Sequence, residues 1–155
     1  MPSSDGEQIT GHTQTHIFRA VLPDELEIYR DLEVEAGKSL YHLAETIVDA
    51  FGFDFDHAFD FYTGTKRAML RTNPRYELFT DMREGDRGRS VKRTKIREAF
   101  AALGDAMTLL YDYGDEWHFH VKLVGLGQKA PNTRYPRVVA SRGEAPAQYD
   151  FPDED

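Results

Sequence analysis

The chain has 155 residues, the length of one ordinary domain, and it contains no cysteine, which excludes disulfides, thiolate zinc sites and cysteine nucleophiles. Its hydrophobic fraction of 40% is that of a globular protein, and no apolar run reaches the roughly 18 residues of a membrane span. The net charge of -8 hides an asymmetry, because residues 66–97 hold eleven Lys or Arg against four Asp or Glu. We therefore expect a cytoplasmic protein that does not enter a membrane and that has one strongly basic segment.

The first third of the chain predicts a tail, a hairpin and a helix. Residues 1–15 are polar and lack periodicity, which is typical of a flexible tail and not of a signal peptide. Residues 16–22 and 26–34 alternate apolar and polar side chains on either side of "PDE", which predicts a β-hairpin with one face in water. Ser39 is a good N-cap, and apolar residues recur at helical spacing from Leu40 to Phe51 before Gly52, which predicts a helix.

The middle of the chain predicts a strand, a long basic connection and a second helix. Aromatic residues alternate with aspartates and indicate a strand over residues 57–62. The basic connection, residues 66–93, is rich in Gly and Arg and has room for one short strand at residues 76–79. Apolar residues at helical spacing predict a helix from Thr94 to Gly104, and residues 129–155 read as an irregular C-terminal tail.

The stretch "LLYDYGDEWHFHVKL", residues 109–123, combines three acids, two histidines and the only tryptophan. Its alternation predicts a hairpin in which Tyr111 and Trp117 face the core and Gly114 takes a positive φ in the turn. The alternative is a metal-assisted hydrolase, since carboxylates and paired histidines suit divalent cations. That site would use Asp112, Asp115, Glu116, His118 and His120. The sequence lacks HExxH or an aspartate-rich calcium loop, and it indicates no cofactor and no catalytic residue.

Four segments together resemble a known family. They are "SLYHLAETIVDAFGF" at 39–53, "HAFDFYTG" at 57–64, "YDYGDEW" at 111–117 and "YPRVVASRGEAPAQY" at 135–149. Over roughly residues 16–150 the chain resembles the Ri-plasmid (pRi) ORF-three-like protein family, small proteins often found near mobile elements. The resemblance implies a compact α+β roll without an established biochemical role. The chain has Phe119 where the family usually has a histidine, which weakens a metal role there.

Some members of that family carry a resolvase label, which requires a nucleophilic serine among arginines and a separate DNA-binding motif. Only Ser90, in "RGRSVKR", sits among arginines, and the chain is short for a second domain. The residues therefore do not fit a recombinase.

The prediction for the fold is a single-domain α+β roll over residues 16–128, with a mainly antiparallel sheet of about five strands and two principal helices. For function, the basic segment favours a non-enzymatic binding or accessory module that binds nucleic acid or an acidic protein surface. Lys95 and Arg97 fall in the first turn of a predicted helix, where the helix dipole disfavours cations. The predicted anion-binding residues are Arg87, Arg89, Lys92, Arg93, Lys95 and Arg97. The alternative is that these cations only neutralise the acidic remainder of the protein.

Overall fold

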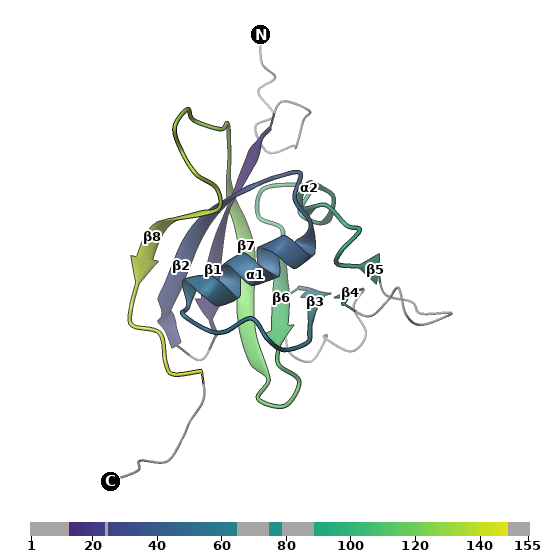
Figure 1. Cartoon of the computed structure of the whole chain (residues 1–155), viewed down its shortest axis with the longest axis vertical. Coiled ribbons are helices and arrows are strands. Elements are labelled where there is room, and N and C mark those ends of the chain that lie inside the picture. Colours follow the sequence, from purple (N-terminus) through teal and green to yellow (C-terminus); the bar gives the residue numbers. More distant parts are fainter. Residues whose placement is uncertain (1–12, 24, 65–74, 79–88, 149–155) are drawn as a thin grey trace.

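The structure is a computed structural model that describes residues 13–23, 25–64, 75–78 and 89–148. Most of the predicted N-terminal tail, and much of the basic connection including Arg87, lies outside these residues. One eight-stranded sheet forms the framework, with strand order β5-β4-β3-β6-β7-β1-β2-β8, and α1 crosses one face of it (Figure 1). The elements in chain order are β1 (Thr15–Leu22), β2 (Glu25–Glu35), α1 (Leu40–Ala50), β3 (Phe59–Thr63), β4 (Arg75–Glu77), β5 (Arg89–Ser90), α2 (Ile96–Ala99), β6 (Ala106–Tyr111), β7 (Trp117–Gly127) and β8 (Arg137–Arg142).

The expected fold class, a roll with about five strands and two principal helices, is wrong. The sheet has eight strands and is mixed, since β4 and β5 run parallel. Only α1, with 11 residues, is a principal helix within the described ranges, because α2 has 4. The short strand expected at residues 76–79 is present as β4, with 3 residues. The strands that the sequence pattern conceals are β5, with 2 residues, and β8, which is exposed along its length, and neither buries a face regularly enough to produce alternation.

The N-terminal hairpin is confirmed, but its outer face is not simply wet. Phe18 and Leu32 pair across β1 and β2 and are fully buried on the core side. On the other side Glu33 is only 4% exposed, and it accepts hydrogen bonds from Thr15 (2.7 Å) and from Arg137 of β8 (2.7 and 3.0 Å). Buried carboxylates are retained where cationic or hydroxyl donors satisfy them, so this face is a polar layer that ties β8 to the sheet.

Helix α1 forms as the sequence predicts. The hydroxyl of Ser39 accepts a hydrogen bond from the backbone N–H of His42 (3.2 Å), as an N-cap does. Phe51 ends the helix and Gly52 follows with φ 78°, a conformation that glycine adopts without strain. Its apolar side packs on the sheet and completes the core; the buried helix residues are Leu40, Leu43, Ala44, Thr46, Ile47 and Val48.

The second helix is much shorter than the predicted span from Thr94 to Gly104. It ends at Ala99, and the carboxylate of Asp105 then accepts hydrogen bonds from the backbone N–H groups of Ala101 (2.9 Å) and Ala102 (3.0 Å). A side chain that captures these donors offers the backbone an alternative to another helical turn. Neither α1 nor α2, the helices within the described ranges, has the length and apolar character needed to cross a bilayer.

The last predicted hairpin is β6 and β7, and it forms the middle of the sheet with β1 against its far side. Tyr111 is fully buried as expected, while Trp117 packs against the core and remains partly exposed. The expected positive φ at Gly114 is wrong, because Asp112 (φ 70°) and Glu116 (φ 54°) take the left-handed positions instead. The side-chain oxygen of Asp112 accepts from the N–H of Gly114 (3.0 Å), a local bond that lets aspartate adopt this conformation.

Candidate functional site

The predicted anion-binding residues that the structure describes begin at the edge of the sheet where β5 lies. Ser90 is buried, and its hydroxyl accepts hydrogen bonds from the backbone N–H groups of Lys92 (3.1 Å) and Arg93 (3.3 Å). The serine thus organises a tight turn from inside, a structural role that leaves it unsuited to act as a recombinase nucleophile. Both basic side chains of the turn are exposed.

A second set of backbone contacts fixes the same turn against the loop before α1. The N–H of Leu40 donates to the carbonyl of Thr94 (2.9 Å), and the N–H of Ile96 donates to the carbonyl of Lys38 (2.8 Å). The backbone N–H of Lys95 donates to the side chain of Glu98 (2.8 Å), and the side chain of Lys95 is exposed. We call Arg89, Lys92, Arg93 and Lys95 the cationic edge, because all four are exposed and lie on or after the edge strand.

Two members of the cationic edge have no anionic partner among the described residues. Lys92 lies over the ring of Tyr41, with 5.6 Å between its ammonium and the ring centroid. Neither Lys92 nor Lys95 forms an ion pair within the part of the chain that the structure describes. Within the described residues these two lysines are therefore not neutralised by a direct ion pair.

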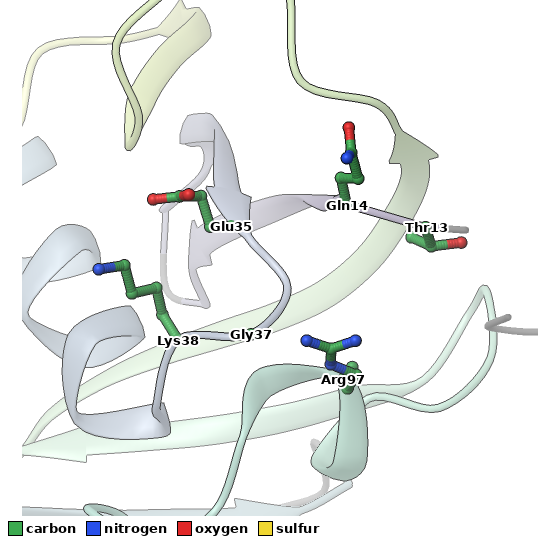
Figure 2. Close-up of a pocket in the computed structure, with 6 residues that line it drawn as sticks. All are labelled: Thr13, Gln14, Glu35, Gly37, Lys38 and Arg97. Carbon is green, nitrogen blue, oxygen red and sulfur yellow. The ribbon is translucent and has the colours of Figure 1, made fainter. Parts of the chain in front are cut away.

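Arg97, the remaining predicted residue, does not join the cationic edge. It lines a cavity of about 460 Å³ together with residues just before β1, at the end of β2 and in the loop after β2 (Figure 2). Its Nε is buried without a hydrogen-bond partner among the described residues. Burial lowers the pKa of the neighbouring His16, and the positive charge of Arg97 lowers it further.

The hairpin carboxylates and histidines do not form a recognisable metal centre. One side-chain oxygen of Asp112 accepts hydrogen bonds from backbone N–H groups of the turn, and the other lies 3.5 Å from the imidazole of His57. Asp115 and Glu116 are exposed. His118 and His120 lie on β7 opposite β6. Over residues 13–23, 25–64, 75–78 and 89–148, no three His, Asp or Glu side chains gather so that they could hold a metal ion. The metal site therefore stays a prediction without geometric support in these ranges.

Sequence reasoning missed a polar lock between this hairpin and the segment before β3. The Tyr111 hydroxyl donates to the carbonyl of Asp54 and accepts from the backbone N–H groups of Asp56 (2.7 Å) and His57 (3.2 Å). The imidazole of His57 also lies 3.3 Å from the Asp56 carboxylate. The only signal in the sequence was the alternation of aromatics with aspartates, which does not say that a distant tyrosine binds their backbone.

A second cavity, of about 480 Å³, has the opposite character. Its lining includes the carboxylates of Glu45, Asp49 and Asp54 and the rings of Phe53 and Phe55. Like charges repel, so anions are disfavoured there and the two cavities can be told apart by charge.

Comparison with known proteins places the chain in a family. The solved structure of a protein of unknown function from Methanosarcina mazei Go1 is similar, with a TM-score of 0.68, 17% identity, and coverage of 83% of this chain and 70% of that chain. At this identity the similarity shows the fold alone. Curated proteins give no match. The family model described as plasmid pRiA4b ORF-3-like protein matches residues 20–150. The chain therefore belongs to the plasmid pRiA4b ORF-3-like protein family.

Proposed function

We propose that the protein is a non-enzymatic binding module whose cationic edge binds a polyanionic partner, with nucleic acid as the preferred class. The observation that carries the proposal is the presentation of Lys92, Arg93 and Lys95 as exposed cations within four residues of a turn fixed from inside. Lys and Arg held at a protein edge neutralise phosphates and release their counterions, which gives affinity without reading sequence.

The rigidity of the turn supports binding over simple solvation. Ser90 holds the turn through two side-chain hydrogen bonds, and the loop before α1 holds it through its backbone, at Thr94 for example. A cation whose backbone is already ordered loses less conformational entropy when it meets a partner. The same geometry suits an acidic protein surface, and titration with both classes of partner distinguishes the two.

The test is a titration of the protein with mixed-sequence duplex and single-stranded nucleic acids at several salt concentrations. We expect affinity that falls steeply with salt, with a slope that becomes shallower by roughly 0.9 for each phosphate contact removed. The test variant replaces Lys92, Arg93 and Lys95 with alanine. The matched control replaces Lys122, Arg134 and Arg142, exposed cations on β7, before β8 and in β8, so that both variants lose three positive charges.

Equal weakening in both variants would show a response to net charge only and would contradict the cationic edge as the site. A different result would show that the cationic edge binds an acidic protein and not nucleic acid. In that case the wild type would not bind nucleic acid at low salt but would bind an acidic polypeptide such as poly-glutamate saturably, and the test variant would lose that binding.

A further inference from the structure

The cavity that contains Arg97 is lined mainly by residues with side-chain hydrogen-bond donors, namely Thr13, Gln14, Lys38 and Arg97. Figure 2 shows Arg97 reaching from α2 toward Gly37, Lys38 pointing to the other side, and Gln14 and Thr13 just before β1 with side chains that extend away from Arg97. The remaining lining residue is Glu35, the single carboxylate of the set. The cavity is separate from the cationic edge, so a ligand bound here is independent of the proposed function.

Arg97 is held in place, but no described residue satisfies its guanidinium. Its backbone N–H donates to the carbonyl of Ala36 (3.0 Å), which fixes the base of the side chain. The guanidinium makes no hydrogen bond or ion pair with any described residue, although its Nε is buried. A buried donor without an acceptor carries a desolvation penalty that is larger when the group is charged, so such a group is expected to have an acceptor in use.

Gly37 makes the position of that guanidinium sterically available. A Cβ added at Gly37 would lie 2.7 Å from one terminal nitrogen of Arg97, closer than real Cβ contacts allow. Any other residue at this position would therefore push the guanidinium aside. The missing side chain at Gly37 thus lets the guanidinium take its present position in the cavity.

Two further residues that carry donors, Gln14 and Thr13, line the same cavity, and in Figure 2 their side chains extend away from Arg97. The side-chain oxygen of Gln14 accepts from the backbone N–H of Lys129 (2.8 Å), which fixes the amide orientation and leaves its NH₂ group as a donor. Neither that NH₂ nor the hydroxyl of Thr13 is engaged by another described residue. The arginine fork is thus the donor group that can contact two oxygens of one anionic group, and the amide and hydroxyl add polar lining to the cavity.

The one carboxylate of the cavity is already neutralised. The ammonium of Lys129 lies 2.8 Å from Glu35, and the hydrogen bond between them holds the pKa of that carboxyl below its ordinary value. Glu35 therefore stays ionised but paired, and it does not supply the counter-charge for Arg97. In Figure 2 its side chain points away from Arg97.

We propose that this cavity is a binding site for a single oxyanion, a phosphate or carboxylate group, which Arg97 holds with its guanidinium beside Gly37. Arginine is suited to this because its planar fork matches both groups in a two-point contact. The ligand that carries the group would reach the cavity from the end of the sheet where β1 begins.

The experiment is a ¹H–¹⁵N NMR titration that follows the Nε–H of Arg97 and the backbone N–H of Gly37. One arm adds inorganic phosphate and the other adds acetate, both at ionic strength held constant with chloride. We expect saturable shifts at both groups. Shifts with phosphate alone identify a phosphate site, shifts with acetate alone a carboxylate site, and shifts with both a general oxyanion site; each of these outcomes supports the proposal.

The variants separate this site from charge effects elsewhere. Arg97→Lys keeps the charge but loses the fork, and we expect affinity to fall roughly tenfold or more. Gly37→Ala should weaken binding through displacement of the guanidinium, whereas Glu35→Gln should strengthen it by removing a negative charge. Arg134→Lys, at an exposed arginine away from the cavity, is the matched control and should bind as the wild type does.

Unfolding midpoints of all variants establish that each one folds. The cationic-edge variant should retain the NMR response to phosphate, so that failure of either proposal leaves the other intact. Shifts that do not saturate with either anion, or an Arg97→Lys variant that binds as tightly as the wild type, would overturn the oxyanion site.

Discussion

Replacing Tyr111 with phenylalanine isolates the energetic contribution of one hydroxyl at the centre of the fold. The ring is fully buried and stacks on Phe55 with 5.8 Å between centroids, and these contacts remain in the variant. The hydroxyl bonds to Asp54, Asp56 and His57 are lost. The segment before β3 then loses its attachment to β6.

The magnitude follows from the number and exposure of the broken bonds. Each intramolecular hydrogen bond contributes about 0.5 to 1.5 kcal/mol net, so three of them set a range of roughly 1.5 to 4.5 kcal/mol. Asp54 and Asp56 are exposed, so their released backbone groups regain water and the loss falls in the lower half of that range. We expect Tyr111→Phe to lower the free energy of unfolding by about 2 kcal/mol.

Urea unfolding followed by circular dichroism measures the effect, and a loss of this size moves the midpoint by about 1 M. Tyr113→Phe is the matched control. That hydroxyl donates to Asp60 (2.9 Å) from a residue that is 46% exposed, so its removal should cost below about 1 kcal/mol. Equal losses in the two variants, or a loss below about 0.5 kcal/mol for Tyr111→Phe, would refute the role assigned to the Tyr111 hydroxyl.

Four other predictions concern pH, the polar layer and the turns. Burial raises the pKa of Tyr111 to about 12 from 10.0, so stability should fall as pH rises through this interval, in which the unfolded chain ionises first; stability profiles of wild type and Tyr111→Phe, which should decline less, check this. Burial lowers the pKa of His16 below 6.5, so stability should fall as pH drops below 6.5, and an NMR titration of the ring that gives a pKa above 6.5 would contradict it. Glu33→Ala should cost about 2 kcal/mol and speed hydrogen exchange in β8, and unchanged exchange there would count against the polar layer as its anchor. Gly104→Ala, at φ 95°, should cost about 1 to 2 kcal/mol, against less than about 0.5 for Gly114→Ala, and denaturant midpoints that reverse this order would reject the turn assignment.

The elements that the sequence predicted well are those that bury one complete face. Helix α1 and the hairpin of β1 and β2 bury apolar side chains that recur at one periodicity, as Leu43 and Ile47 on the helix and Phe18 on the strand illustrate. Apolar residues recur with a regular period because one face of the element is buried, so the sequence pattern predicts these elements correctly. The family resemblance is confirmed as well, since the family model covers residues 20–150.

The elements that it predicted poorly depend on partners remote in the chain. Strand β8 is exposed and is held by backbone pairing to β2 and by Arg137 on Glu33, neither of which leaves a periodic trace. The turn at Gly114 follows from a side-chain bond of Asp112 that composition does not reveal. The sequence grouped Arg97 with the other basic residues because they are neighbours in the chain. In the structure its backbone bonds to Ala36, and its side chain lines a cavity apart from the cationic edge.

The pairing of β1 with β7 has a consequence for how the chain reaches its native state. This pairing joins residues as distant as Thr15 and Gly127. Forming it closes a loop of nearly the whole domain, and the chain loses conformational entropy in doing so. Mean contact order is correspondingly high, and folding on the millisecond to second scale is typical of such topologies. During synthesis the hairpin of β1 and β2 precedes β7 by a long interval, in which β1 is an open edge able to pair with another chain.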